Sequence, residues 1–313
     1  MKCLYCGKEI KNGETDWHER CLKKFFGVKK MPELDISDTQ LALLAKNAVD
    51  QGFTVTGVQK KLSLHLSNDE RARLTIIDYP TGYILKPPTK IYDSLPEFED
   101  LAMRLAEIAG IQTVPHGLLR FGNDYAYITK RIDRNIANNA ISLYAMEDFC
   151  QLSNRLTQDK YRGSYENCGR IIKSFSTRPG LDLSELFLRI GFSFIIGNSD
   201  MHLKNFSLIE QEPASRQFTL SKAYDMLPVN IIMPDDQEQL ALTLNGKKRN
   251  ITKKDFMEFS KNCQIPEQSA KNMLIRLCSL KNKFLLQCND SYLSELQKIK
   301  MKELIEKRID SIS

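Results

Sequence analysis

The stretch Gly197-Asn-Ser-Asp200-Met-His-Leu-Lys-Asn205 decides how the rest of this 313-residue chain is interpreted. It follows residues 183–196, whose apolar pattern predicts a buried helix, and precedes residues 206–209, which predict a strand. Asp200 and Asn205 are five positions apart. At this spacing one loop turn lets a carboxylate meet a substrate hydroxyl while an amide oxygen holds Mg²⁺. The loop therefore predicts phosphoryl transfer.

A second carboxylate that fits the same chemistry lies twenty residues beyond Asn205. Asp225 follows another strand pattern, residues 218–220, in the sequence Ala223-Tyr-Asp225. Phosphoryl transfer needs such a group because Mg²⁺ takes hard oxygen ligands while it bridges phosphate oxygens. An Asp and an Asn five positions apart also occur by chance in acidic loops, so the flanking helix and strand are essential to this interpretation.

A lysine at the end of an apolar strand pattern is the next candidate. Lys86 follows Ile84-Leu85, and Glu99 belongs to a helix predicted over residues 96–109. A buried ammonium group needs an anionic partner, so we expect the two to pair and Lys86 to hold phosphate oxygens. The alternative is that Lys86 is an edge residue beside Pro87-Pro88 and that Glu99 is an exposed helix charge.

The segment Thr54-Val-Thr56-Gly57-Val-Gln-Lys60-Lys61 lies ahead of a predicted strand, where a phosphate-covering loop would be. It has one glycine and matches neither of the common glycine-rich phosphate motifs. Backbone amides around Gly57, with Lys60 or Lys61, can still surround phosphates. Taken alone, the pattern is equally that of an ordinary turn.

The chain is predicted to have three parts: a Cys/His module (1–30), a β-rich lobe (31–133) and a helical lobe (134–313). Helices are predicted over residues 37–52, 96–109, 142–156, 165–175 and 183–196 and from about 252 onward, and strands over 55–66, 74–78, 83–86, 117–121, 125–129, 206–209 and 218–220. The strands at 74–78 and 83–86 are expected to form a hairpin. This order is that of an α+β, bilobal kinase.

Composition places the chain among globular proteins, with 42% hydrophobic and 27% charged residues. The first ten residues lack the apolar region of a secretory signal. The most apolar stretch, residues 181–197, contains three charges and is too short to span a membrane. We therefore expect a cytoplasmic protein that does not enter membranes, with its eight cysteines as thiols or metal ligands.

The net charge of +6 is concentrated at the two ends, because basic residues outnumber acidic ones in 1–30 and 247–313. Basic ends can meet nucleic acid or an acidic partner. The lysines are interspersed with acids, however, and lack interleaved aromatic residues, which is more typical of solvated helix faces.

Seven segments in order resemble the signatures of HipA-type serine/threonine kinases, the toxins of bacterial toxin–antitoxin systems. These segments are Thr54–Leu64, Tyr83–Lys86, Glu99 with Met103–Ala106, Thr129–Arg134, Met146–Gln151, Gly197–Ser207 and Ala223–Asp225. The similarity runs from about residue 50 to residue 250. It implies a bilobal protein-kinase-like (HipA-like) fold that uses ATP and Mg²⁺ to phosphorylate serine or threonine.

The resemblance also implies roles for individual residues. Asp200 would be the catalytic aspartate, Asn205 and Asp225 the Mg²⁺ ligands, Lys86 the phosphate lysine and Glu99 its partner. The phosphate-covering loop would be formed by Gly57, Val58, Gln59 and Lys60. The backbone hinge that meets adenine would be formed by Thr129, Lys130, Arg131 and Ile132.

Two further residues, His202 and Lys204, lie inside the implied catalytic loop. Lys204 would stabilise the charge of the transferring group, whereas His202 either takes part in the chemistry or packs the loop. Members of the family can phosphorylate a hydroxyl residue of the phosphate loop and silence themselves. The resemblance makes Thr54 and Thr56 the candidates in this chain. A phosphate dianion at either position would repel the phosphates of ATP.

The chain departs from the long HipA-type toxins before residue 50, where there is room only for the Cys/His module and one helix. In this it resembles the short HipT-like kinases of three-component systems. There a small antitoxin resembling the missing N-terminal subdomain and a DNA-binding HipB-like antitoxin complete the set, so the kinase would meet DNA only indirectly. The resemblance implies a substrate among translation components, such as an aminoacyl-tRNA synthetase.

The Cys/His module has the spacing of a metal site, with Cys3 and Cys6 forming one close pair and His18 and Cys21 another. Two such pairs can close a tetrahedral Cys₃His site on Zn²⁺, with a structural role. The alternative is a small apolar knob that is packed around Trp17 and whose thiols are merely buried.

Two other functions are compatible with these patterns. A small-molecule phosphotransferase would share the same Asp, Asn and Asp layout. A non-catalytic, zinc-anchored regulator would use the basic C-terminal helices to bind an antitoxin or DNA. The combination of Lys86, Asp200, Asn205 and Asp225 favours a protein kinase over both.

Overall fold

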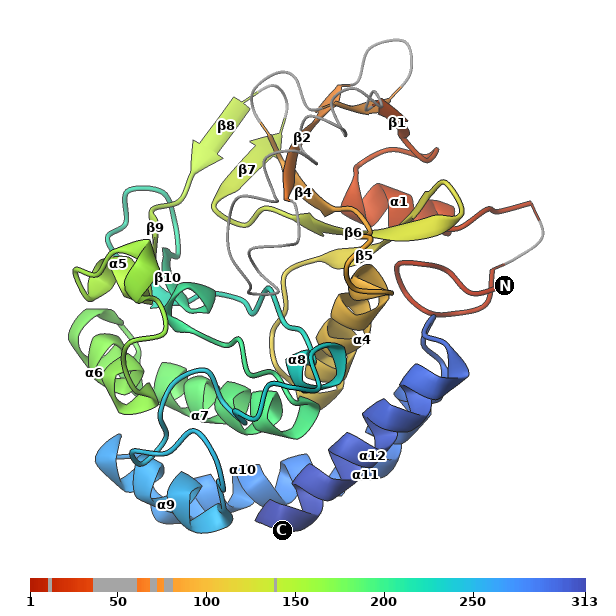
Figure 1. Cartoon of the computed structure of the whole chain (residues 1–313). Helices are drawn as coiled ribbons and strands as arrows, with labels where there is room; N and C mark the ends of the chain where they lie inside the picture. Colours follow the sequence, from red (N-terminus) through yellow and green to blue (C-terminus); the bar gives the residue numbers. More distant parts are fainter. Residues whose placement is uncertain (11–12, 36–60, 68–71, 76–80, 138–139) are drawn as a thin grey trace. The chain divides into compact units, whose positions relative to one another are not determined.

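The computed structural model describes residues 1–10, 13–35, 61–67, 72–75, 81–137 and 140–313, which form two compact units (Figure 1). The first unit comprises Met1–Asp100 and Val114–Ser142, and the second comprises Leu101–Thr113 and Leu143–Ser313. The helix expected over residues 37–52 lies outside the described residues. The division into three parts at residues 30 and 133 stays a prediction.

A mixed sheet forms the body of the described part of the first unit, with strand order β1-β3-β2-β4-β6-β5. Its strands are β1 (Glu33–Asp35), β2 (Leu62–Ser67), β3 (Arg73–Thr75), β4 (Tyr83–Lys86), β5 (His116–Phe121) and β6 (Asp124–Lys130). β5 and β6 confirm the hairpin expected around Gly122-Asn-Asp124. Lys86 of β4 pairs with Tyr127 of β6, so their side chains lie on the same face.

The hairpin expected between the strands now labelled β3 and β4 is wrong, because β2 lies between them. Leu74 of β3 pairs with Leu66, and Leu85 of β4 pairs with Leu62. β2 buries Leu62 and Leu64 and offers backbone hydrogen bonds along both of its edges. A turn signal predicts that the chain bends, but not which strand edge the returning segment reaches.

Smaller elements complete the first unit. Helix α1 (Glu19–Phe25) lies beside the sheet (Figure 1), with the hydroxyl of Tyr83 donating to the carbonyl of Phe25 at 3.3 Å. Strands β7 (Arg134–Ala137) and β8 (Ala140–Leu143) pair as a separate ribbon. Helix α4 (Leu95–Ala109) begins in the first unit, and its residues from Leu101 onward belong to the second. It confirms the amphipathic helix predicted at 96–109 and ends at Gly110, whose φ of +84° is left-handed.

The single helix expected over residues 142–156 is wrong. The chain forms β8, then β9 (Met146–Asp148), α5 (Phe149–Leu152) and a 3₁₀ turn (Thr157–Asp159). Asp148 and Gln151 form a capping box: Asp148 Oδ1 accepts from the amide of Gln151 at 2.9 Å, and Gln151 Oε1 accepts from the amide of Asp148 at 3.0 Å. This cap starts a helix after Asp148, so the apolar residues before it belong to strands.

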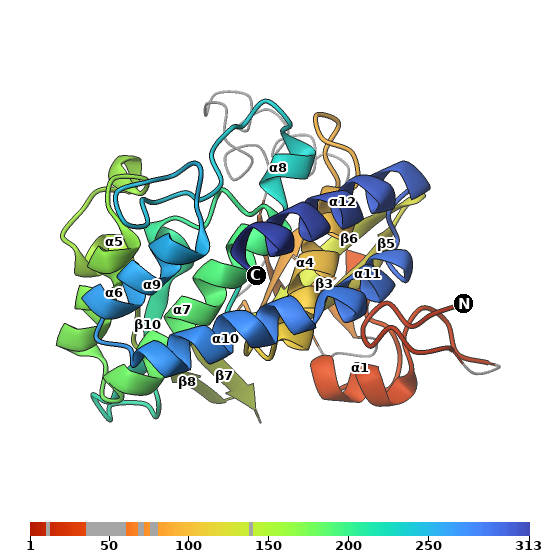
Figure 2. The ribbon, with the colours of Figure 1, turned by 90° about the horizontal axis from the view of Figure 1, so that it is seen from below.

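Helices dominate the second unit. They are α6 (Tyr165–Phe175), α7 (Pro179–Ile196), α8 (Val229–Ile232), α9 (Lys253–Asn262), α10 (Glu267–Ser279), α11 (Lys281–Asn289) and α12 (Glu295–Ile312). As predicted, α7 is buried on most sides, because α6, α10 and α12 all contact it (Figure 2). A small antiparallel sheet of β11 (Phe218–Leu220), β10 (Ser207–Glu210) and β9 lies in the same unit.

In the part of the chain that the structure describes, none of the helices combines the length and the apolar character needed to cross a membrane.

Gly197 ends α7 with a left-handed φ of +71°, and a Cβ atom there would lie 2.5 Å from Leu304 Cδ2 and 3.2 Å from Asn230 Cβ. We expect Gly197→Ala to lower the free energy of unfolding by about 1–3 kcal/mol, because the left-handed backbone penalises a side chain and its neighbours must move. Urea denaturation followed by circular dichroism measures this change.

The matched control is Gly180→Ala on the same helix, where nothing lies within 4 Å of the new Cβ. It is expected to raise the free energy of unfolding by about 0.5 kcal/mol, because alanine favours the helix. Equal stability of the two variants would contradict the role assigned to Gly197.

Candidate active site

The structure brings the candidate phosphate lysine of the first unit together with its expected partner. Lys86 Nζ donates to Glu99 Oε1 at 2.5 Å, and the side chains are 4% and 0% exposed. Neither residue is therefore an edge charge or a solvated helix charge. A buried ion pair of this kind fixes the ammonium group in one position.

Three residues that the sequence analysis missed surround this pair. The ammonium of Lys86 lies 5.5 Å from the ring centroid of Tyr127, which stacks on His116 at 5.8 Å. His116 Nδ1 lies 3.5 Å from Asp100 Oδ1, and all of these side chains are buried. No local motif marks them, because Tyr127 and His116 meet Lys86 through the register of β4, β5 and β6, and Asp100 comes from helix α4.

The implied adenine hinge begins at the end of β6, the second strand of the β5–β6 hairpin. Its residues are Thr129 and Lys130, at the end of β6, followed by Arg131 and Ile132. Two of them, Thr129 through its hydroxyl and Lys130 through its amide, donate to the carbonyl of Pro115. Arg131 and Arg134 both bind the carboxylate of Asp133, at 2.7 and 2.8 Å. Partial burial raises the pKa of Asp133. The guanidinium groups of Arg131 and Arg134 lower it by more, so the net shift of the pKa is downward.

The phosphate-loop candidates lie outside the described residues, so their roles stay predictions. They are Thr54, Thr56, Gly57, Val58, Gln59 and Lys60.

The central residue of the second unit, Asp200, lies in a buried loop that hydrogen bonds hold at several points. Its amide donates to Asn198 Oδ1 at 3.1 Å, and its carbonyl accepts from Asn205 Nδ2 at 2.9 Å. The hydroxyl of Tyr161 donates to Asp200 Oδ1. Asp200 and Asn205 are thus brought together, and the amide oxygen of Asn205 is the atom that can face a metal ion.

His202 and Lys204 occupy different surroundings within this loop. His202 is buried, with Nε2 3.9 Å from Asp200 Oδ1 and its ring edge-on to Tyr161 at 5.0 Å. Lys204 is partly exposed and donates to Asp148 Oδ2 at 2.6 Å. Asp148 therefore both caps α5 and holds Lys204, a link that sequence reasoning missed. The catalytic roles of His202 and Lys204 stay predictions.

Asp225 has a left-handed φ of +59°, which is rare for a residue with a side chain. Strained backbone of this type concentrates at functional sites, where the surrounding structure enforces it. Its neighbour Tyr224 donates to the carbonyl of Lys204 at 3.1 Å and lies 2.5 Å from Ser207 Oγ. The segment that contains Asp225 is thereby tied to the Asp200 loop.

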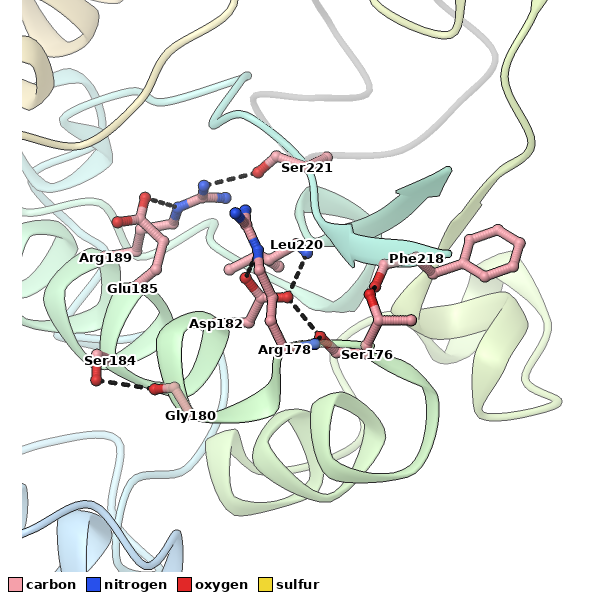
Figure 3. A network of polar contacts seen from close by, with 11 residues as sticks. Ser176, Arg178, Gly180, Asp182, Ser184, Glu185, Arg189, Phe218, Leu220 and Ser221 are labelled. Carbon is pink, nitrogen blue, oxygen red and sulfur yellow. Dashed lines mark hydrogen bonds and ion pairs between the residues drawn. The ribbon is translucent and has the colours of Figure 1, made fainter. Parts of the chain in front are cut away.

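A buried polar network on α7 fixes the strand that leads to Asp225 (Figure 3). Arg189 donates to Glu185 Oε1 at 2.9 Å and to the carbonyl of Ser221 at 2.7 Å. Asp182 Oδ2 accepts from the amide of Leu220 at 2.7 Å. Sequence reasoning treated these charges only as interruptions of an apolar stretch, although charges in a buried helix are themselves a signal of such anchoring.

The C-terminal helix also supports the loop. Arg308 of α12 donates to Asn230 Oδ1 at 2.9 Å. Asn230 in turn donates from its amide to the carbonyl of Gly197 at 3.0 Å and from its side chain to Ser199 Oγ at 3.4 Å. Both acceptors lie just before Asp200, so α12 is linked through one side chain to the start of the loop.

Tyr161→Phe tests the hydrogen bond to Asp200. The hydroxyl holds the carboxylate of Asp200 in place, so its loss is expected to lower kcat by about tenfold. Steady-state kinetics at saturating substrate measures this change. Tyr92→Phe in the first unit is the control, and an unchanged kcat in Tyr161→Phe would show that the hydroxyl does not act on Asp200.

The four metal-ligand candidates are also brought together, in the first unit. The ligand atoms of Cys3, Cys6, His18 and Cys21 all lie within 4.8 Å of one another.

Comparison with known proteins identifies the family. A model of the HipA-like C-terminal domain matches residues 53–283, most of this chain. The chain belongs to the HipA-like family. It is 30% identical over 233 residues to the putative kinase Y4dM of Sinorhizobium fredii, covering 69% of this chain and 55% of that protein. It is 27% identical over 214 residues to the serine/threonine-protein kinase toxin HipA of Shewanella oneidensis, covering 62% and 47%.

The HipA-like chain thus spans about half the length of these curated relatives. Among solved structures, it resembles HipA in a complex of HipA, HipB and operator DNA from Shewanella oneidensis, with a TM-score of 0.71, 19% identity and coverage of 84% of this chain and 66% of that one. It also resembles the Helicobacter pylori proinflammatory kinase CtkA, with a TM-score of 0.54, 17% identity and coverage of 75% and 86%. These likenesses confirm the protein-kinase-like fold.

Proposed function

We propose that this chain transfers the γ-phosphoryl group of ATP to a serine or threonine hydroxyl of a protein. Membership of the HipA-like family and relatives named as kinases support the reaction class. The observation that carries the proposal is the buried loop in which Asn205 holds the backbone of Asp200. That loop presents a carboxylate and an amide oxygen from one rigid turn.

The donor chemistry of the second unit fits Mg²⁺. Asn205 Oδ1 and the carboxylate of Asp225 are hard oxygen ligands of the kind that Mg²⁺ prefers, and Tyr224 ties the segment of Asp225 to the loop of Asn205. We therefore assign these two residues as the metal ligands. When bound, Mg²⁺ would offset the negative charge of the phosphates.

In the proposed phosphoryl transfer, other side chains of the chain would accept the proton and bind the phosphate oxygens. Asp200 would accept the proton of the substrate hydroxyl as its oxygen bonds to the γ-phosphorus and the bond from that phosphorus to the ADP oxygen breaks. Lys86, held by Glu99, would bind the α- and β-phosphate oxygens. Lys204 would offset charge on the transferring group, and its pairing with Asp148 would keep it in place.

The biological role that we propose is that of a toxin. The named relative from Shewanella oneidensis is a kinase toxin, and its structure was determined with HipB and operator DNA. By analogy, a HipB-like antitoxin is the first candidate partner and a small antitoxin of a three-component system the second. The substrate would be a translation component, such as an aminoacyl-tRNA synthetase, which would place the activity in the cytoplasm.

Incubation with γ-labelled ATP, Mg²⁺ and a host lysate tests the proposal. We expect label on a protein, as phosphoserine or phosphothreonine, and no label when EDTA removes Mg²⁺. Label found only on a small molecule would instead indicate a small-molecule phosphotransferase. No transfer, together with salt-dependent DNA binding, would indicate a non-catalytic regulator.

The same assay tests autophosphorylation. A double variant, Thr54→Ala with Thr56→Ala, is expected to lose the label on the chain itself. Label retained elsewhere on the chain would refute the assignment of these two residues.

A further inference from the structure

Two short segments of the first unit each present a pair of metal-ligand side chains. Cys3 and Cys6 lie in a tight turn, closed by the amide of Cys3 donating to the carbonyl of Lys8 and the amide of Gly7 donating to the carbonyl of Cys3, both at 2.8 Å. Gly7 has a left-handed φ of +71°, which this turn requires directly after Cys6. The turn therefore holds the two thiols on one side.

The second pair lies at the start of α1. His18 is the N-cap residue of this helix and Cys21 lies in its first turn, so both side chains leave the helix near the same end. His18 Nε2 lies 2.8 Å from the carbonyl oxygen of Glu9. Because a carbonyl oxygen only accepts, Nε2 carries the proton and Nδ1 presents its lone pair, as a metal ligand requires.

The lone pair of His18 Nδ1 meets the thiols at distances that suit a tetrahedral ion. Nδ1 lies 3.3 Å from Cys6 Sγ and 3.7 Å from Cys21 Sγ. With Zn–S near 2.3 Å and Zn–N near 2.0 Å, tetrahedral angles place a sulfur and a nitrogen ligand about 3.5 Å apart. The observed distances bracket this value, and Cys3 completes the group.

We propose that Cys3, Cys6, His18 and Cys21 bind one Zn²⁺ ion in a closed structural site. Three thiolates and an imidazole are the soft donor set that zinc prefers among biological divalent ions. Four protein ligands leave no open position for substrate, so the site is structural. The proposal is independent of phosphoryl transfer, since it concerns a cluster that lies wholly in residues 3–21.

The metal site would fix the residues that dock the module on the sheet. Leu4, next to Cys3, accepts a backbone hydrogen bond from Leu118 at 3.1 Å. Trp17, next to His18, donates from its indole to the carbonyl of Leu118 at 2.8 Å. Both docking residues are thus adjacent in sequence to a ligand.

The docking surface is close-packed. A Cβ atom at Gly117 would lie 2.9 Å from the ring of Trp17, which also stacks on Tyr5 at 4.9 Å. Trp17 is 1% exposed. An apolar knob accounts for the packing of Trp17 on Phe25 and Phe26, but it does not explain why three thiols and a ring nitrogen converge.

Metal analysis of the full chain, purified under reducing conditions from zinc-supplemented cells, tests the site directly. We expect about one zinc per chain in the wild type and in the control Cys278→Ser, and less than about 0.1 in Cys3→Ser with Cys6→Ser. A wild-type chain without bound zinc, or a double variant that keeps it, would overturn the proposal.

A second measurement guards against a double variant that fails to fold. Replacing zinc by Co²⁺ in the wild type is expected to produce the intense visible bands of a tetrahedral cobalt thiolate, and the single variant Cys6→Ser is expected to weaken them. Weak bands typical of octahedral cobalt in the wild type would exclude a Cys₃His site.

Trp17 provides a readout of docking, because it is the only tryptophan in the chain. Removing zinc with a chelator is expected to shift its fluorescence to the red as the buried ring becomes hydrated. Adding Zn²⁺ back, but not Mg²⁺, is expected to reverse the shift. An emission spectrum that does not respond to the chelator while zinc leaves the protein would refute the docking role.

Discussion

Asp200→Asn is expected to lower the rate of phosphoryl transfer by about a thousandfold or more, because an amide cannot accept the proton of the substrate hydroxyl. The substitution keeps the size of the side chain. The amide oxygen of asparagine can still accept the hydrogen bond that Tyr161 donates to Asp200 Oδ1. We therefore expect normal folding together with the loss of activity, measured by single-turnover transfer of labelled phosphate and by thermal denaturation.

The matched control for this variant is Asp235→Asn, an exposed aspartate of the same unit. It should retain the wild-type rate. If Asp200→Asn kept more than about a tenth of the wild-type rate, Asp200 would not be the proton acceptor. If it instead lost activity together with its folded structure, the second-unit loop would be a structural rather than a catalytic element.

The second large effect is expected for Lys86→Met, which leaves the buried carboxylate of Glu99 without its ammonium partner. Both side chains of this pair are almost wholly buried. Removing one member of a buried ion pair typically lowers the free energy of unfolding by about 3–5 kcal/mol, whereas replacing both with apolar groups is often nearly neutral. Lys86→Met should therefore lose both stability and activity.

The double variant Lys86→Met with Glu99→Leu separates these two losses. It is expected to recover most of the stability in urea denaturation but to remain inactive, because no ammonium group is present to bind phosphate oxygens. Lys90→Met, at an exposed lysine of the same unit, is the control. Wild-type activity in the double variant would show that Lys86 serves only the fold.

Local signals were sufficient for the elements that depend on local physics. Helical periodicity and a following glycine predicted α4, and a turn of Gly122-Asn-Asp124 predicted the β5–β6 hairpin. The pairing of β3 depends instead on the order of strands in the folded sheet. There β2 lies between β3 and β4 and pairs with both, so the expected β3–β4 hairpin does not form. The error at residues 142–156 was avoidable from the sequence alone. Asp148 followed three positions later by Gln151 has the pattern of a capping box, which predicts that a helix starts after Asp148.

The candidate site was predictable to a similar extent. Spacing within one loop pointed to Asp200 and Asn205, and the structure links them directly. Tyr161 was not predictable, because it acts on a residue 39 positions away and no short motif contains both partners. The charge of Arg189 within a buried helix signals anchoring, but it does not identify the carbonyl of Ser221, 32 positions away, as the acceptor. Contacts of this range depend on the packing of whole helices.

The contacts from Arg308 through Asn230 to Gly197 connect helix α12 with the start of the Asp200 loop. Arg308 is more than 100 positions from Asp200 in the sequence, yet through Asn230 it supports the turn that comes just before Asp200. Proteolytic loss of the turns of α12 that carry Arg308 is for this reason expected to loosen the Asp200 loop. Preparations used for activity measurements should therefore retain α12 intact.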